Sequence, residues 1–214
     1  MERIALIGFG EAGAAFAEGA DWLDRACAYD RKTDSPASRD AKLSDYRAAG
    51  MNGALRSDEA LDGAQLIFSL VTADQALPAA RSATVAPGAL WLDCNSVAPE
   101  TKRAAAQAIE AAGGRYVDVA VMSPVRPARR GAPLLLSGPH AEAAAEALRG
   151  LGFAKVRVVD GPVGAASSIK MIRSVMVKGL EALSAECVLA AEAAGVRDEV
   201  LASLDASWRE ESWA

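Results

Sequence analysis

The N-terminal stretch Ile4-Ala5-Leu6-Ile7-Gly8-Phe9-Gly10-Glu11-Ala12-Gly13 decides how the rest of the chain is interpreted. Four apolar residues predict a buried strand, and the Gly-x-Gly-x-x-Gly run after it opens an alanine-rich helical pattern over residues 14–23. In such a turn Gly8 permits the tight bend, Gly10 lets a phosphate approach the backbone, and Gly13 lets the helix pack on the strand. Because free N–H groups at a helix start favour anions, the stretch predicts a dinucleotide-binding turn.

An acid downstream supports this interpretation. A predicted strand over residues 25–29 ends at Asp30, about 20 residues past the turn, where a carboxylate can accept both ribose hydroxyls. Arg31 and Lys32 follow and could instead bind a 2′-phosphate, so NAD and NADP both stay open. NAD is favoured because Asp30 would repel that phosphate. The residues expected to hold the cofactor are Gly8, Phe9, Gly10, Glu11, Ala12, Gly13, Asp30, Arg31, Val71 and Thr72.

Composition narrows the class of protein. With 214 residues, 51% of them hydrophobic, the chain has room for one large domain and a small appendage. A net charge of −5 argues against nucleic acid as a partner. No apolar run reaches the length of a membrane span, and no leader is visible. Three scattered cysteines predict reduced thiols in the cytoplasm, and a single histidine makes a histidine-based metal site improbable, so no metal is expected.

The order of elements predicts an α/β fold of the Rossmann type, with a doubly wound and mostly parallel sheet. Further strands are expected over residues 54–55, 65–71, 89–93, 115–121, 133–137 and 155–159, with helices between most of them. A helical pattern then runs over residues 164–194, and a shorter helix is expected over 198–207. We therefore expect a nucleotide-binding domain over residues 1–162 and a shortened helical part over 163–214.

The long helix carries one lysine of interest. Ligands of an open parallel sheet bind beyond the carboxyl ends of its strands, and the long helix begins just past the last strand. Lys170 lies in its first turns, with Ser167 and Ser174 on the same helical face. A partly buried lysine beside a nicotinamide could have a lowered pKa and exchange a proton with a substrate hydroxyl. A solvated surface charge is the alternative.

The sequence resembles the 3-hydroxyisobutyrate / 6-phosphogluconate dehydrogenase family, the β-hydroxyacid dehydrogenases, and within it a branch with a phosphogluconate-dehydrogenase-like C-terminal domain. The resemblance is carried by the glycine turn, by Asp93-Cys94-Asn95-Ser96-Val97-Ala98-Pro99, by Gly114-Arg115-Tyr116-Val117-Asp118, and by the stretch from Gly164 through Lys170 to Ser174. It implies hydride transfer between a small 3-hydroxyacid and NAD or NADP, with Lys170 as general acid/base. It also implies substrate or nicotinamide contacts from Asn95, Ser96 and the loop after Val121.

Three departures from the family pattern affect the substrate and the assembly. The Gly-rich substrate loop is replaced by Val121-Met122-Ser123-Pro124, in which Ser123 is the stand-in. Ser174 occupies the position of the expected asparagine. The family's helical domain is shortened here, whether naturally or by truncation. Without the missing helices, apolar side chains of the long helix, such as Val175, Leu183 and Leu189, would need a partner chain to cover them. A homodimer through this helix is therefore expected.

Two other functions stay open from the sequence. An imine reductase using NADPH would share the architecture, but Lys170, Asp30 and the polar Asn95-Ser96 pair argue against it. A nucleotide-binding protein without catalysis is favoured by the short C-terminus and the altered substrate loop. Candidate arginines for an acidic substrate group are Arg126, Arg129, Arg130 and Arg173, of which Arg129 and Arg130 are expected to be solvated loop charges.

Overall fold

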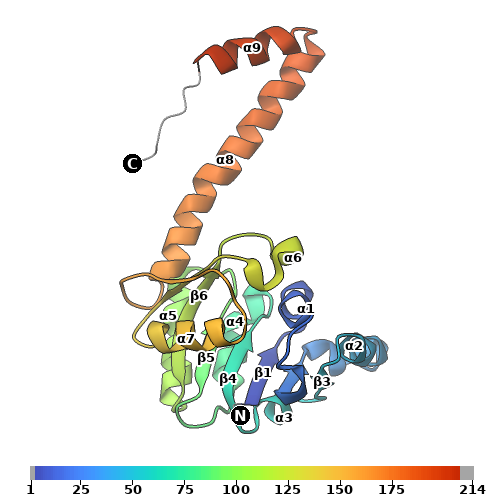
Figure 1. Cartoon of the computed structure of the whole chain (residues 1–214), viewed down its shortest axis with the longest axis vertical. Helices are drawn as coiled ribbons and strands as arrows, with labels where there is room; N and C mark the ends of the chain where they lie inside the picture. Colours follow the sequence, from blue (N-terminus) through green and yellow to red (C-terminus); the bar gives the residue numbers. More distant parts are fainter. Residues whose placement is uncertain (1–2, 208–214) are drawn as a thin grey trace. The chain divides into compact units, whose positions relative to one another are not determined.

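Figure 1 shows the computed structural model, which describes residues 3–207 of the chain. The chain divides into two compact units, Met1–Lys170 and Met171–Ala214. The division falls inside the long helix α8 (Ala165–Ala193), so its first turn and Lys170 belong to the first unit. The domain bounds expected from the sequence, 1–162 and 163–214, stay a prediction.

The first unit is a sheet with helices on both faces (Figure 1). Its strands are β1 (Arg3–Ile7), β2 (Ala26–Tyr29), β3 (Asn52–Gly53), β4 (Ala64–Ser69), β5 (Leu90–Asp93), β6 (Arg115–Val121), β7 (Leu134–Ser137) and β8 (Val156–Val158). The helices before α8 are α1 (Glu11–Ala17), α2 (Pro36–Ala48), α3 (Ser57–Leu61), α4 (Ala76–Ser82), α5 (Pro99–Ala111), α6 (Val125–Ala128) and α7 (Ala141–Gly150). Short 3-10 helices are η1 (Leu23–Arg25), η2 (Arg31–Thr33), η3 (Ala73–Gln75) and η4 (Arg129–Gly131).

The strand order is β3-β2-β1-β4-β5-β6-β7-β8, and neighbouring strands are parallel except where β7 runs antiparallel to β6. The first six positions reproduce the doubly wound order, in which the winding reverses between β1 and β4. The expected fold class, a mostly parallel Rossmann sheet, is confirmed. The antiparallel β7 is explained by its connection, because α6 and η4 are too short to carry the chain back to the start of the sheet.

Alternate residues of β1 belong to two separate hydrophobic cores, one on each face of the sheet. Ile4 and Leu6 of β1 belong to the core that includes Phe16 of α1 and Leu148 of α7. Ala5 and Ile7 belong to the other core, with residues of α3, α4 and α5. Successive side chains of a strand point to opposite faces of the sheet, so an unbroken apolar run becomes a strand buried on both sides. This three-layer arrangement places the loops after β1, β4, β5 and β6 at one edge of the sheet.

Helix α1 ends at Ala17, earlier than the helix expected over residues 14–23. Gly19 has a left-handed φ of +64°, which stops the helix, and Arg130 supplies the missing donors. Its guanidinium donates to the carbonyl oxygens of Phe16, Glu18 and Gly19 at 2.7, 2.9 and 3.0 Å. The expectation that Arg130 is a solvated loop charge is therefore wrong, because a helix C-terminus needs such donors and attracts a cation.

The second unit consists of the remainder of α8 and of α9 (Arg197–Ser207). Several of its apolar side chains are exposed: Ile172 by 72%, Val175 by 76%, Leu183 by 65% and Leu189 by 70%. No helix within residues 3–207 has both the length and the apolar character needed to cross a membrane.

Candidate functional site

The glycine turn joins β1 to α1 and leaves open space at one position. Gly8 has a φ of +94°, and a Cβ on it would lie 2.4 Å from the carbonyl oxygen of Leu70. Only glycine fits there without a shift of the backbone. Gly10 caps α1 without a side-chain hydrogen bond, and a Cβ on it would meet no atom within 4 Å. The Leu70 backbone thus fills the space beside Gly8, whereas the space beside Gly10 is empty, as close approach of a phosphate requires.

A pocket of about 820 Å³ opens beside this turn. Its size lies within the range of small-molecule and cofactor sites. It is lined by Ile7, Gly8, Gly10, Glu11, Tyr29, Asp30, Arg31, Lys32, Asp34, Ser57, Leu70, Val71, Thr72, Gln75, Pro78, Ala79, Ser82 and Trp91. The lining includes most of the residues expected to hold the cofactor. Phe9, Ala12 and Gly13 are not part of the lining. Phe9 packs edge-on against Tyr46 in the core, and Gly13 lies close to the Gly8 carbonyl.

Asp30 ties the end of β2 to the glycine turn. One carboxylate oxygen accepts the backbone N–H of Phe9 at 2.9 Å, and the other accepts the N–H of Lys32 at 3.0 Å. Sequence reasoning assigned Asp30 to ribose only and missed this role. Each carboxylate oxygen can accept more than one hydrogen bond, so the side chain keeps acceptor capacity toward the pocket. The predicted contact with ribose stays a prediction.

Charges of both signs surround the mouth of the pocket near Asp30. Arg31 and Lys32 are exposed and line it, and Asp34 accepts a hydrogen bond from the hydroxyl of Tyr29 at 2.9 Å. Burial, followed by the bond to Asp34, raises the pKa of Tyr29 to about 12, so this hydroxyl stays a neutral donor at pH 7. The carboxylates of Asp30 and Asp34 would repel a 2′-phosphate, whereas the side chains of Arg31 and Lys32 would attract it.

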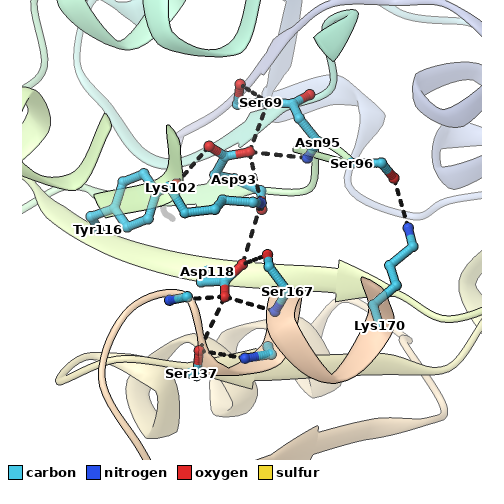
Figure 2. A network of polar contacts seen from close by, with 12 residues as sticks. Ser69, Asp93, Asn95, Ser96, Lys102, Tyr116, Asp118, Ser137, Ser167 and Lys170 are labelled. Atoms are coloured by element: carbon cyan, nitrogen blue, oxygen red, sulfur yellow. Dashed lines mark hydrogen bonds and ion pairs between the residues drawn. The ribbon is translucent and has the colours of Figure 1, made fainter. Parts of the chain in front are cut away.

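Lys170 and Ser96 come together at the carboxyl ends of the strands (Figure 2). The ammonium of Lys170 donates to Ser96 Oγ at 2.7 Å. The neighbouring Asn95 is buried, and its amide nitrogen donates to Asp93 Oδ1 at 2.7 Å and to Ser69 Oγ at 2.9 Å. The sequence analysis named Lys170, Asn95 and Ser96 as residues of the expected site. The structure adds the direct bond between the lysine and the serine, and it shows that Asn95 is held from below by Asp93.

A buried lysine beneath this pair was not found from the sequence. Lys102 of α5 is fully buried, with its ammonium 3.0 Å from Asp93 Oδ1 and 3.3 Å from Asp118 Oδ1. A signal was present, because Lys102 stands four and seven residues before Ala106 and Ile109, which form the buried face of the helix. A lysine on an apolar helix face above two strand-borne aspartates indicates a buried ion cluster.

The other predicted site residues are placed as follows. Ser123 lies in the loop after β6, next to the loop of Ser96, and its hydroxyl donates to the carbonyl of Pro124 at 3.2 Å. Ser174 lies one helical turn after Lys170, in the second unit. Arg126 and Arg173 are exposed, and Arg129 forms an ion pair with Glu18 at 2.7 Å. The substrate contacts expected of Ser123 and Ser174 stay predictions.

Cys94 lies between Asp93 and Asn95 and is buried. Burial raises the pKa of its thiol to about 12, so the thiol stays protonated at neutral pH and supplies no nucleophile. In the part of the chain that the structure describes, no group of three or more His, Cys, Asp or Glu side chains could hold a metal ion.

The fold and the pocket together define a nucleotide-binding protein of the doubly wound α/β class. Residues 3–156 match the model of the NAD-binding domain of 6-phosphogluconate dehydrogenase, and the chain belongs to this family. The resemblance to the 3-hydroxyisobutyrate / 6-phosphogluconate dehydrogenases is thereby confirmed. An uncharacterised 28.5 kDa protein of Methanothermus fervidus is 29% identical over 140 residues, which are 65% of this chain and 53% of that protein. The chain thus matches about half the length of this curated relative.

Solved structures agree with this assignment. A conserved hypothetical protein from Sinorhizobium meliloti is 36% identical, with a TM-score of 0.81 over 100% of this chain and 72% of that one. A protein of unknown function, described as structurally similar to 3-hydroxyacid dehydrogenases, is 30% identical, with a TM-score of 0.76 over 95% of this chain and 75% of that one.

Two more distant structures share the fold. The 3-hydroxyisobutyrate dehydrogenase of Mycobacterium tuberculosis, solved with L-serine, is 19% identical, with a TM-score of 0.80 over 100% of this chain and 72% of that one. An imine reductase of Myxococcus stipitatus, solved with NAD⁺, is 20% identical, with a TM-score of 0.75 over 97% of this chain and 71% of that one.

The empty space beside Gly10 leads to a testable prediction. We expect Gly10→Ala to weaken NADH binding by about tenfold or more, because the methyl group would fill the space that a phosphate needs. The free energy of unfolding should change by no more than about 1 kcal/mol, since the new Cβ meets no neighbour within 4 Å. Fluorescence titration with NADH and urea unfolding measure the two effects.

Gly8→Ala is the comparison variant for stability, because its Cβ, unlike that of Gly10→Ala, has no space. Its Cβ would meet the Leu70 backbone in a left-handed conformation, so it should cost at least about 2 kcal/mol of stability. If Gly10→Ala bound NADH as tightly as the parent, the turn would not be a phosphate site.

Proposed function

We propose that the chain is an NAD(P)-dependent oxidoreductase that transfers a hydride between a small 3-hydroxyacid, or a related alcohol, and a nicotinamide cofactor. The observation that carries the proposal is the bond from Lys170 to Ser96 at the strand ends. This pair lies on the sheet edge that also carries the glycine turn, because β1, β4, β5 and β6 are parallel and end on the same side. Ligands of this fold bind at that edge.

The residues present fit the cofactor. The open space at Gly10, the pocket beside it and the acceptor Asp30 supply a place for pyrophosphate and for ribose. A nicotinamide group, when bound, supplies the hydride acceptor or donor of the reaction. The distant imine reductase was solved with NAD⁺, which supports a nicotinamide cofactor for this architecture.

Lys170 is proposed as the general acid/base. In its neutral form Nζ accepts the proton of the substrate hydroxyl during oxidation, and as an ammonium it returns a proton to the carbonyl oxygen during reduction. Ser96 fixes the position of Nζ, and its hydroxyl proton remains available to a second acceptor such as a substrate oxygen. Ser123, in the adjoining loop, is the proposed further substrate contact.

The lysine is tested directly by substitution. Lys170→Ala should lower kcat by about 10²–10⁴-fold, the usual contribution of a general acid/base, while NADH affinity stays within about twofold. Absorbance at the NADH band, with a panel of 3-hydroxyacids and NAD⁺ or NADP⁺, measures turnover. Lys178→Ala removes an exposed lysine from the same helix and should have parent activity. Equal turnover by Lys170→Ala and the parent on any substrate would refute this role.

NAD is proposed as the preferred cofactor. The Asp30 carboxylate faces the pocket and would repel a 2′-phosphate, whereas Arg31 and Lys32 would attract it. We expect NADH to bind more tightly than NADPH in parallel fluorescence titrations. Asp30→Asn should narrow the difference, and Arg31→Ala should widen it. A parent protein that bound NADPH more tightly would assign the dominant role to the two cations.

Two alternatives remain, each with a supporting observation. An imine reductase is supported by the shared fold of the Myxococcus stipitatus enzyme, and reduction of cyclic imines by NADPH would identify it. A nucleotide-binding protein without catalysis is supported by the altered loop at Ser123. Tight cofactor binding with no turnover of hydroxyacids or imines would favour it.

A homodimer through α8 is proposed for the assembly. The exposed Val175, Leu183 and Leu189 form apolar surface on a single helix, and such surface is normally covered. Light scattering should give twice the mass of one chain. Leu183→Asp should shift the protein toward a single-chain mass, and a parent protein with the mass of one chain would contradict the proposal.

A further inference from the structure

The first turn of α8 is held by side chains from the sheet, as Figure 2 shows. The carboxylate of Asp118, on β6, accepts the backbone N–H groups of Gly164 and Ser167 on Oδ2, at 3.1 and 3.0 Å. Its Oδ1 accepts the hydroxyl of Ser167 at 2.6 Å. Ser137 Oγ, on β7, accepts the N–H of Ala166 at 3.0 Å. These are N–H groups that a helix start leaves without partners, so two strands together cap α8.

The buried ammonium of Lys102 lies beside the Asp118 carboxylate. Asp118 is fully buried, and Lys102 lies 3.3 Å from its Oδ1 while also donating to the Asp93 carbonyl oxygen at 2.6 Å. Tyr116 donates its hydroxyl to Asp93 Oδ2 at 2.6 Å. Burial, then the charge of Asp93, raises the pKa of Tyr116, so it stays a neutral donor. One ammonium, one phenol and the positive end of α8 thus stabilise two buried carboxylates.

The buried cluster of Lys102, Asp93 and Asp118 bonds to a residue near each member of the Lys170–Ser96 pair. Asp93 holds Asn95, the residue next to Ser96, through its backbone and side-chain N–H groups at 3.0 and 2.7 Å. Asp118 holds Ser167, which lies three residues before Lys170 on the same side of α8. Lys102 bridges the two aspartates. Because each residue of a helix turns by about 100°, a slip of α8 by one residue would carry Nζ away from Ser96.

Tight folding alone does not require these charges. Buried ion pairs are often replaced by apolar side chains without loss of stability, because removing two charges from water is costly. What charged hydrogen bonds supply is a fixed geometry, since the acceptor must meet several donors at once. At the start of α8, the Asp118 carboxylate meets the N–H groups of Gly164 and Ser167 and the hydroxyl of Ser167.

We propose that Lys102 and Asp118 are positioning residues that hold Lys170 against Ser96. The inference rests on the proposed function, in which Lys170 is the proton-transfer group. Both side chains are fully buried and do not line the cofactor pocket, so they act through α8 and the loop after β5.

The test measures the position of Lys170 without cofactor or substrate. Acetic anhydride labels lysines in the folded protein, and mass spectrometry compares labelling of Lys170 with labelling of the exposed Lys155. Asp118→Asn, which keeps the size and removes the charge, should raise the relative labelling of Lys170 by about tenfold, the equivalent of one lost hydrogen bond to a charged group. Ser96→Ala removes the Oγ acceptor of the bond from Lys170 and should also raise the relative labelling of Lys170. Glu110→Gln, which neutralises an exposed carboxylate on α5, should change nothing.

Melting temperature separates positioning from folding. Parent-like melting with raised Lys170 labelling supports the proposal, and parent-like melting with unchanged labelling overturns it. Should Asp118→Asn fail to fold, Ser167→Ala removes one bond to the same carboxylate and leaves every charge in place. It should raise the relative labelling of Lys170 by about threefold, and unchanged labelling in this variant would also overturn the proposal.

Lys102 is tested through its coupling to Asp118. Lys102→Met leaves two buried carboxylates without their cation and should raise Lys170 labelling at least as much as Asp118→Asn. In the double variant the two effects should combine to less than their product, because both residues act on the same turn of α8. Independent, multiplicative effects would contradict a shared role.

A failure of the proposed function is distinguishable from a failure of this inference. If the parent bound NADH but turned over no substrate, labelling would still report whether Lys102 and Asp118 place Lys170. Where turnover is found, Asp118→Asn should lower kcat and leave the KM for the cofactor unchanged. A raised KM with parent kcat would place the effect in binding and overturn the positioning role.

Discussion

The close approach of Gly8 to the carbonyl of Leu70 is the constraint on which the cofactor site depends. A Cβ at Gly8 would lie 2.4 Å from that oxygen, so the loops after β1 and β4 can meet only with glycine here. Strand order reverses at this point, and the helices on either side leave the sheet in opposite directions. The pocket lies in the resulting crevice, with Gly10 open toward it and Asp30 fixing the turn through the N–H of Phe9.

The second organising feature is the buried lysine between two aspartates. Lys102 links the end of β5 to β6, and Asp118 carries that link to the first turn of α8. One ammonium faces two carboxylates there, and hydrogen bonds from Tyr116 and from the N–H groups at the start of α8 help to stabilise the second negative charge in the interior. The glycine turn follows β1, and the aspartates of this cluster lie on β5 and β6 of the same sheet, with β4 between β1 and β5. The proposed chemistry requires both, because one supports the cofactor and the other places Lys170 at Ser96.

Local sequence patterns predicted the features of this fold that depend on local interactions. Apolar runs such as residues 65–71 indicated buried strands, and the glycine spacing with Asp30 indicated the turn and the end of β2. Contacts between distant segments were not predictable in this way. Arg130 caps α1 from more than a hundred residues away, and Lys102 of α5 pairs with Asp118 of β6. Periodicity can place a lysine on the buried face of a helix. The carboxylates that pair with its charge come from distant strands, so only the tertiary fold identifies them.

The measurement that tests the central claim most directly follows the hydride itself. The protein is incubated with NAD⁺ and with 3-hydroxyacids that carry deuterium on the hydroxyl-bearing carbon, and the NADH formed is analysed by mass spectrometry. The account predicts NADH heavier by one deuterium for at least one substrate, with the transfer slowed by about 10²–10⁴-fold in Lys170→Ala. Protein that binds NADH, yet forms none across hydroxyacids of varied size and charge, would contradict the assignment of this site to hydroxyacid oxidation.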